Sequence, residues 1–230
     1  YLDMPELLVN DIWVDLPPKA MRQYNEMEKQ LFTELDEDTS LTASSASAVY
    51  AKCRQMANGA VYDDLGEISQ VHEAKSQALS DLHSELAGKP LLTAFQFRHD
   101  KPAIASASPS SHGFIDGSRT ANQVSKTIEQ WNGSNLSLLG LQSASSHGLN
   151  IQKGGCSDLA WYGLTNNFED YAQTNFRIYR QGNETSQVRL HRILARNTVD
   201  EQVLDTVQCK DMSQRGILEA IKRYRRRKGE

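Results

Sequence analysis

Leu91-Leu-Thr-Ala-Phe-Gln-Phe97 is the stretch of sequence on which the fold depends. It is a short apolar run directly after the turn signal Lys89-Pro90, and such a run is typical of a strand buried on both faces. Further strands and helices alternate after it. The expected strands are 91–97, 112–116, 136–142, 158–162 and 187–194, and the expected helices are 120–132 and 167–179. Because this alternation requires crossover connections, the sequence predicts an α/β fold with a doubly wound parallel sheet.

The segment before this alternation, residues 1–88, shows helical spacing of apolar residues and no obvious strand. The expected helices there are 18–36, 43–58 and 69–87. We therefore divide the chain into a helical lead-in that packs on a lobe, the α/β lobe itself, and a C-terminal helix with a basic tail. The bounds of the three parts are 1–88, 89–210 and 211–230, and the last helix is expected over 212–226. Within the lobe, Thr198-x-x-Glu201 is a capping box that opens a helix.

Composition is that of an ordinary globular protein, with 39% hydrophobic and 23% charged residues in a chain of 230. No apolar run approaches the roughly 18 residues of a membrane span, so no membrane partner is expected. The three cysteines are far apart and the six histidines form no H-E-x-x-H, which predicts no metal site and a reducing compartment. The net charge is −9 over residues 1–100 and +5 over residues 101–230. An anionic partner is therefore expected to meet the second half of the chain, and the equal alternative is that both halves are only solvated.

Several signatures of nucleotide binding are absent from the sequence. The only Gly-Lys pair, Gly88-Lys89, is followed by proline, so there is no phosphate-cradling P-loop. The sequence also lacks G-x-G-x-x-G and G-x-S-x-G. The acidic string at 36–38 ends an expected helix and is interpreted as solvated. We therefore expect no nucleotide site that the chain builds alone.

Gln173-Thr-Asn-Phe-Arg177-Ile-Tyr-Arg180 is the strongest candidate for chemistry. On the helix expected here, Gln173, Arg177 and Arg180 are four and three residues apart and share one face. Two guanidiniums and an amide on one face form a donor array suited to a polyphosphate. The alternative is that these arginines pair with acidic neighbours such as Glu169.

Together with several upstream stretches, these residues resemble the second lobe of Swi/Snf-type superfamily-2 helicase-like ATPases. The matching stretches are 89–97 for the fourth motif, Phe114-Ile-Asp-Gly-Ser118 after it, Leu138-Leu139 with Ser143-Ala-Ser-Ser-His-Gly-Leu-Asn-Ile151 for the fifth, and 173–183 for the sixth. The spelling H-G-L-N-I-Q-K-G-G is similar to that of compact phage, prophage and plasmid members. The resemblance covers about residues 10–220, and it departs from the family at Ser145, Ser146, Phe176 and Asn183.

The resemblance implies a RecA-like lobe of the P-loop NTPase type, with helices on both faces of the sheet and a helical extension before it. It implies that Arg177 and Arg180 are arginine fingers, which reach ATP held with Mg²⁺ by a separate N-terminal lobe of the same protein. Gln173 would sense the γ-phosphate. Gly148 and Asn150 would form the turn between the ATP cleft and a DNA track, although a plain left-handed turn at this glycine is an equal alternative.

The resemblance also implies contacts with the backbone of double-stranded DNA that do not read its sequence. The implied contact residues are Gln96, Gly117, Ser118, Gln142 and Ser143. For Gln96 the alternative is a solvent-facing strand end. Trp131 and Trp161 are expected in the core rather than stacked on bases. Lys75 is expected to be solvated rather than to lie at a lobe junction.

The expected function is that of a motor lobe in a DNA-dependent ATPase that translocates along double-stranded DNA. The chain alone is expected to hydrolyse no ATP. The alternative is a non-catalytic interaction module that kept the fold, against which the two arginines argue and for which Ser145 and Ser146 argue. An unrelated, self-contained enzyme is excluded by the missing nucleophile and cofactor motifs. The expected location is the cytoplasm of a bacterial or phage-infected cell, or the nucleus of a eukaryotic one.

Overall fold

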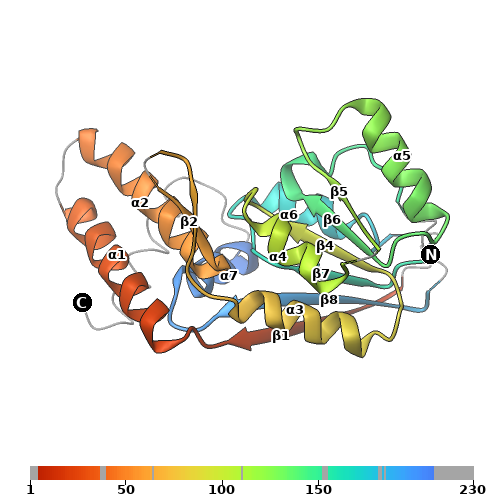
Figure 1. Ribbon diagram of the computed structural model, residues 1–230, viewed down its shortest axis with the longest axis horizontal. Coiled ribbons are helices and arrows are strands. Elements are labelled where there is room, and N and C mark those ends of the chain that lie inside the picture. Colours follow the sequence, from red (N-terminus) through yellow and green to blue (C-terminus); the bar gives the residue numbers. More distant parts are fainter. Residues whose placement is uncertain are drawn as a thin grey trace.

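The computed structural model describes residues 5–36, 40–63, 65–109, 111–151, 155–180, 183 and 185–209. At its centre is a sheet of six strands in the order β1-β8-β7-β4-β6-β5, all parallel (Figure 1). The strands are β1 Glu6–Val14, β4 Leu91–Phe95, β5 His112–Ile115, β6 Leu138–Gln142, β7 Asp158–Trp161 and β8 Gln187–Ala195. The predicted α/β class and parallel sheet are confirmed, and each predicted strand ends within two residues of its expected bounds.

Helices lie on both faces of this sheet. The helices of the described residues are α1 Pro18–Asp36, α2 Ser40–Asn58, α3 Ala74–Glu85, α4 Asp100–Ala107, α5 Ala121–Asn132, α6 Phe168–Asn175 and α7 Val199–Cys209, and the first two of them project from the sheet. Successive residues of a strand point to opposite faces. Leu91 of β4 accordingly packs with Leu79 of α3 and Ile104 of α4 on one face. Its neighbour Leu92 lies in the larger core on the other face, together with Trp131 of α5.

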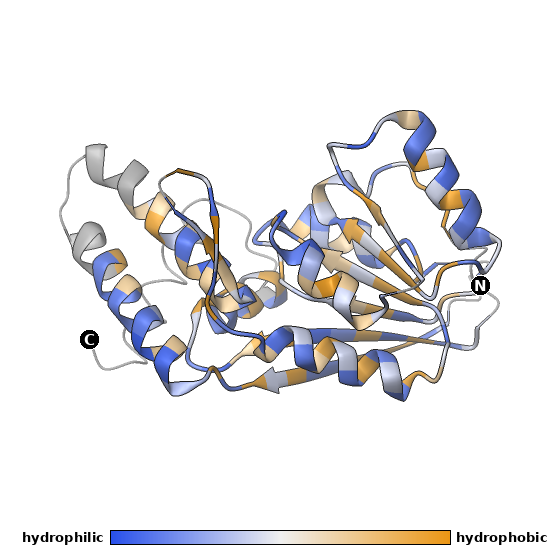
Figure 2. Cartoon of the chain, viewed as in Figure 1, coloured by the Kyte–Doolittle hydropathy of each residue, from blue (hydrophilic) through white to orange (hydrophobic). Residues whose placement is uncertain are grey.

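The hydropathy of the chain follows this layering. Hydrophobic residues are concentrated on the central strands, while the outer turns of α1 and α5 are mostly hydrophilic (Figure 2). Trp131 is 1% exposed and Trp161 is fully buried, so the prediction that both belong to the core is confirmed. Among the described residues, no helix combines the length and apolarity that crossing a bilayer requires.

The interpretation of residues 1–88 as all-helical is wrong at β1. This strand pairs in parallel with β8 along its whole length and forms one edge of the sheet. The polar residues that interrupt its apolar run are cross-strand partners. Asp11 accepts two hydrogen bonds from Arg192, at 2.5 and 2.9 Å, and Asn10 lies 3.2 Å from the imidazole of His191. These partners are 181 residues away, so the local sequence does not explain the polar residues within the run.

The lead-in is also interrupted by a short hairpin of β2, Ala60–Tyr62, and β3, Ile68–Gln70. The helix expected from residue 69 therefore begins only at Ala74. The backbone amide of Ala74 donates a hydrogen bond to the ring of His72. The helix α3 packs on β1, β8 and α4 and is part of the sheet layers, whereas α1 and α2 form a pair that projects from the sheet (Figure 1). The expected C-terminal helix 212–226 and its basic tail lie outside the described residues.

The prediction of a capping box at the start of α7 is wrong, because the two side chains form other hydrogen bonds than a capping box requires. The hydroxyl of Thr198 accepts from the amide of Asp200, and the carboxylate of Glu201 accepts from the amide of Asn197 rather than from that of Thr198. Both side chains still satisfy free amides at the helix start, which is the physical purpose of a cap.

Lys75 is a further correction, since it was expected to be solvated. Its side chain is fully buried, and its ammonium lies 2.5 Å from the carboxylate of Asp200. It also donates a hydrogen bond of 2.9 Å to Asn58. A buried ammonium is tolerated because both partners compensate for the lost hydration.

A buried carboxylate, Asp158, ties β7 to β8 at the amino ends of the strands. It accepts hydrogen bonds from Arg189 at 2.6 and 2.7 Å, from His191 at 2.9 Å and from Ser157 at 2.7 Å. Burial acts to raise the pKa of Asp158, but the bonds from Arg189 and His191 outweigh it and hold the pKa well below its usual range. The charged carboxylate therefore stabilises the folded state.

Asp158→Asn is expected to lower the free energy of unfolding by about 3 kcal/mol at pH 7, because it leaves a buried network without its charge. A depressed folded pKa contributes stability above the unfolded value of about 3.9, and this contribution is lost as the pH falls below it. Urea unfolding of both proteins at pH 7, 4 and 3 should therefore show a difference that shrinks toward low pH. A difference independent of pH contradicts the assignment.

Candidate functional site

Four of the five predicted DNA-contact residues form one hydrogen-bonded cluster at the carboxyl ends of the strands. The side-chain amide of Gln96, the residue directly after β4, donates to the hydroxyl of Ser143 at 2.8 Å. Gln142, at the end of β6, donates to the carbonyl of Gln96 at 3.3 Å and accepts from the amide of Gly117 at 3.2 Å. The ends of β4, β5 and β6 are thereby joined, at the edge where parallel sheets bind ligands. Gln96 is thus more than a solvent-facing strand end.

The fifth residue, Ser118, is held in the turn after β5. Its backbone amide donates to Asp116 at 2.8 Å and its hydroxyl donates to the same carboxylate. Lys101 of α4 donates to Asp116 at 2.7 Å. Burial acts to raise the pKa of Asp116. The hydrogen bonds from Lys101 and Ser118 have the larger, opposite effect, and they lower the pKa to about 2. The turn is therefore anchored by a carboxylate that is charged at neutral pH.

Exposed cations flank this cluster, and the sequence interpretation did not include them. Arg98 follows Gln96 by two residues and Arg119 follows Ser118 directly, and both arginines are exposed. Their position next to the predicted contacts was the available signal. A cation beside a preformed loop is the arrangement that binds a phosphate backbone.

The loop from Ser143 to Ile151 begins at this cluster and leads from the carboxyl end of β6 toward the amino end of β7. It begins with a 3₁₀ turn, Ser143–Ser145, and Gly148 then adopts a φ of +69°. A Cβ at Gly148 would meet no atom within 4 Å, so this glycine serves a left-handed turn rather than a close approach. The far end of the loop is held by α5, since Trp131 donates to the carbonyl of Ile151 at 2.9 Å and Asn132 to that of Asn150 at 3.0 Å.

The expectation that Gln173, Arg177 and Arg180 share one helical face is wrong. The helix α6 ends at Asn175, and the chain continues in tighter turns, in which the amide of Arg177 donates to the carbonyl of Thr174. Tertiary contacts impose this end. Trp161 donates to the side chain of Asn175 at 2.9 Å, and Ile178 is drawn into the core at 2% exposure.

The guanidinium of Arg177 is nevertheless held in place. One of its terminal nitrogens donates to the carbonyl of Leu149 at 3.1 Å, which joins this segment to the loop that contains Gly148. The Nε of Arg177 is buried and has no partner within the described part of the chain. Burial, and then the like charge of Arg180, lower the pKa of Arg177. The site thus brings two cations together.

No ion pair joins Arg177 or Arg180 to a carboxylate among the described residues. Glu169 accepts instead a hydrogen bond from the side-chain amide of Gln173 at 3.0 Å. Within the described part of the chain, therefore, neither Glu169 nor Asp170 pairs with either arginine. The Oε1 of Gln173 and the hydroxyls of Thr174 and Ser146 are buried and likewise lack partners within the described ranges.

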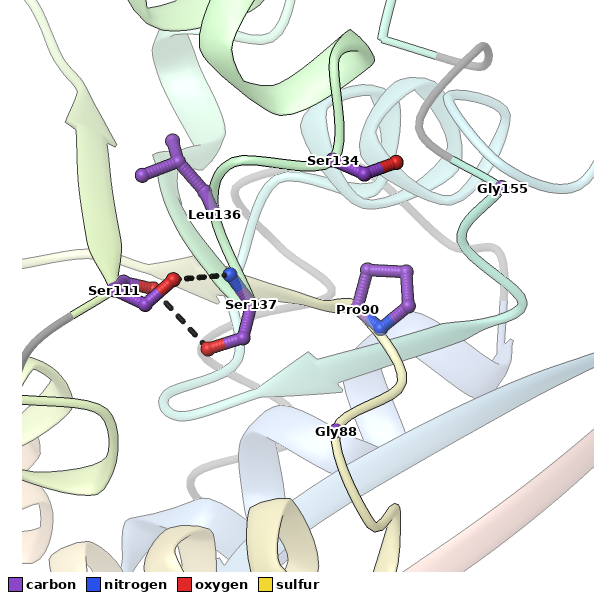
Figure 3. A pocket seen from close by; sticks show the side chains of 7 residues that line it. All are labelled: Gly88, Pro90, Ser111, Ser134, Leu136, Ser137 and Gly155. Atoms are coloured by element: carbon purple, nitrogen blue, oxygen red, sulfur yellow. Dashed lines mark hydrogen bonds between the residues drawn. The ribbon is translucent and has the colours of Figure 1, made fainter.

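A cavity of about 170 Å³ lies at the opposite edge, beside the amino ends of β4, β5 and β6 (Figure 3). It is lined by Gly88, Pro90, Ser111, Ser134, Leu136, Ser137 and Gly155. Ser137 bonds to Ser111 through both its amide, at 2.9 Å, and its hydroxyl, at 3.2 Å. The cavity thus lies at the other end of the strands from the cluster of Gln96, Gly117, Gln142 and Ser143. Within the described ranges, no group of three or more His, Cys, Asp or Glu residues could hold a metal ion.

Comparison of sequences identifies two relatives, and no protein-family model matches the chain. Protein p41 of Acyrthosiphon pisum secondary endosymbiont phage 1 is 35% identical over 97% of this chain and 48% of its own length. An uncharacterised ATP-dependent helicase of Mycoplasma genitalium is 21% identical over 87% of this chain and 20% of its own length. The chain therefore spans about half of the phage relative and a fifth of the helicase.

Comparison of structures shows the same architecture in ATPases. The C-terminal part of the Fun30 ATPase domain matches with a TM-score of 0.73 at 11% identity, over 96% of this chain and 98% of that one. The Sulfolobus solfataricus SWI2/SNF2 ATPase C-terminal domain matches with a TM-score of 0.66 at 13% identity, over 92% and 90%. The core of that ATPase in complex with dsDNA gives 0.68 at 16% identity, over 90% and 44%. The fold that the resemblance implies is therefore confirmed, since the chain has the RecA-like fold of the C-terminal part of SWI2/SNF2 ATPases.

Proposed function

We propose that this chain is the C-terminal motor lobe of a DNA-dependent ATPase that translocates along double-stranded DNA. The observation that carries the proposal is the uncompensated charge of Arg177, which lies beside Arg180 with a buried Nε that has no partner among the described residues. A partly buried cation without a counter-charge is unfavourable. An incoming anion removes this cost, so the pair is suited to a phosphate group.

In this proposal Arg177 and Arg180 act on ATP that a separate N-terminal lobe of the same protein holds with Mg²⁺. As the γ-phosphoryl group is transferred, the guanidiniums neutralise charge that develops in the transition state. The amide of Gln173, whose Oε1 is unpartnered within the described ranges, orients toward the γ-phosphate or its attacking water. Because the sequence has no P-loop, the chain alone hydrolyses no ATP.

The loop of residues 143–151 supports a mechanical link between the two proposed sites. At one end Ser143 binds Gln96, and toward the other end the carbonyl of Leu149 binds Arg177. A movement of Arg177 when it contacts the phosphate would therefore displace the same loop whose Ser143 binds Gln96 at the DNA edge. Gly148 lies in the turn between these two contacts, and Asn150 fixes the end of that turn on α5.

The proposed DNA surface is the edge formed by Gln96, Gly117, Ser118, Gln142 and Ser143. Arg98 and Arg119 supply positive charge there, and the hydrogen-bonded cluster fixes the loops that carry them. Such contacts reach the phosphate backbone and carry no sequence information. The Sulfolobus SWI2/SNF2 core solved with dsDNA supports duplex DNA as the partner. The proposal places the protein inside the cell, where ATP and DNA occur together.

Duplex DNA binding by the purified chain is expected to be weak, independent of sequence and strongly dependent on salt. With about three phosphate contacts, affinity should fall about 40-fold between 50 and 200 mM salt. Fluorescence titrations of two unrelated labelled duplexes at both salt concentrations measure this. Replacing Arg98 and Arg119 together by alanine should remove about two contacts and flatten the salt dependence accordingly.

Arg22→Ala provides the matched control, since it removes an exposed arginine from α1, away from the proposed edge. It should leave the salt dependence unchanged. Affinity that ignores salt, or that differs between the two duplexes, contradicts the proposed DNA edge. If the chain binds DNA normally but the full-length protein hydrolyses no ATP, the alternative of a non-catalytic interaction module is supported instead.

A further inference from the structure

A continuous chain of buried polar contacts connects α7 with the end of α2 and the start of α4. Lys75 of α3 lies 2.5 Å from the carboxylate of Asp200 in the first turn of α7 and donates to the Oδ1 of Asn58 at 2.9 Å. The Nδ2 of Asn58, the last residue of α2, lies 3.2 Å from both carboxylate oxygens of Asp100. None of these four residues is more than 4% exposed. Four separate helices thus meet in one buried network.

The network ends on the backbone of the loop after β4. The Oδ2 of Asp100 accepts hydrogen bonds from the backbone amide of Phe97 at 2.9 Å and from the backbone amide of Gln96 at 3.2 Å. Gln96 in turn donates to Ser143, in the cluster at the carboxyl edge. The placement of Gln96 therefore depends on Asp100, and the placement of Asp100 depends on Asn58 and Lys75.

We propose that Asp200, Lys75, Asn58 and Asp100 form a buried relay that positions Gln96 for contact with DNA. The proposal rests on the DNA-binding function proposed above and adds positioning residues that touch no DNA. Burying two carboxylates and an ammonium costs desolvation, so the network is a poor device for stability alone. A fully satisfied buried network does, however, hold its members in one arrangement.

The direction of the bonds explains how the relay works. Asn58 can satisfy an acceptor and a donor at once, so it joins the Lys75 ammonium to the Asp100 carboxylate without adding charge. Asp100 remains an acceptor for two amides of the loop. A displacement of α2 or α3 relative to α7 consequently reaches Gln96 through three hydrogen-bonded side chains.

Asn58→Ala in the full-length protein is the decisive variant, because it removes the central link and leaves both the Lys75–Asp200 pair and the loop contacts of Asp100 in place. Amide hydrogen exchange reports the position of the loop directly. We expect exchange at Gln96 and Phe97 to become about tenfold faster. Asp158→Asn is the matched control, since it disrupts a buried carboxylate network at the opposite edge of the sheet and should leave these two amides unchanged.

The second measurement separates positioning from stability. For Asn58→Ala, we expect the duplex concentration that half-saturates ATP hydrolysis to rise about tenfold, with turnover at saturating duplex within twofold of the original protein. Gln96→Ala should show a similar rise. Since the relay acts through Gln96, combining the two substitutions should add no more than twofold to the effect of Gln96→Ala alone.

The outcomes distinguish the relay from the function on which it rests. Unchanged exchange at Gln96 and Phe97 in Asn58→Ala overturns the relay, and so does a loss of duplex affinity no larger than that of Asp158→Asn. Additive losses in the double variant overturn it as well. If Gln96→Ala itself leaves duplex affinity unchanged, the proposed DNA edge is wrong, whereas faster loop exchange in Asn58→Ala would still support the structural arm of the relay.

Discussion

Replacing Arg177 or Arg180 by alanine in the full-length protein is expected to lower DNA-stimulated ATP turnover by about 10³-fold, or about 4 kcal/mol of transition-state stabilisation. An arginine finger acts on charge that appears as the phosphoryl group is transferred, so folding and ground-state DNA binding should change little. Lysine should rescue neither position, because a point charge lacks the planar fork of the guanidinium. Turnover and thermal melting, measured on the same preparations, test these expectations.

Arg196→Ala is the appropriate control for both substitutions. Arg196 is 50% exposed at its side chain and lies 3.7 Å from Asp15 and over the ring of Trp13, so it is an arginine with partners of its own. Its removal should leave turnover within about twofold. If Arg177→Ala instead melts early and loses activity only in proportion to the unfolded fraction, then the hydrogen bond to Leu149 is its main contribution. Normal turnover in well-folded Arg180→Ala protein refutes its role as a finger.

Lys75→Met is expected to lower the free energy of unfolding by about 3–5 kcal/mol, the largest stability effect among these substitutions. Methionine matches the length of the lysine stem but removes the ammonium, which leaves the buried Asp200 carboxylate without its counter-charge and the Oδ1 of Asn58 without that donor. Removing one member of a buried ion pair is costly because the remaining charge stays desolvated. Urea unfolding at pH 7, followed by circular dichroism, provides the measurement.

The matched control for this substitution is Lys126→Met, on the exposed side of α5. A surface lysine of this kind should change the free energy of unfolding by less than about 0.5 kcal/mol. A loss below about 1 kcal/mol in Lys75→Met would show that the Lys75–Asp200 contact contributes little to stability. Its part in the relay would then rest on the exchange measurements alone.

The place of the candidate DNA edge in the fold could be predicted from local sequence, whereas the roles of its residues came from the family resemblance. The apolar runs that became β4, β6 and β7 identify buried strands because both of their faces are covered, and a parallel sheet gathers the residues after each strand at one edge. For this reason Gln96, Gly117 and Gln142, which are far apart in the chain, could be expected to lie together. The exposed cations Arg98 and Arg119 could have been found in the same way, since they follow the predicted contacts within two residues.

By itself, then, the sequence determined the fold class, the positions of strands β4 to β8 and the residues that follow them at the carboxyl edge, because these depend on local periodicity and on the geometry of parallel strands. Only the tertiary structure decided the rest. Strand β1 forms by pairing along its whole length with β8, where Asp11 also meets Arg192, and Lys75 is buried because Asp200 compensates its charge. The helix α6 stops at Asn175 because Trp161 binds that side chain and the core takes up Ile178. In each case the stabilising partner is distant in sequence, and its contribution outweighs the local preference.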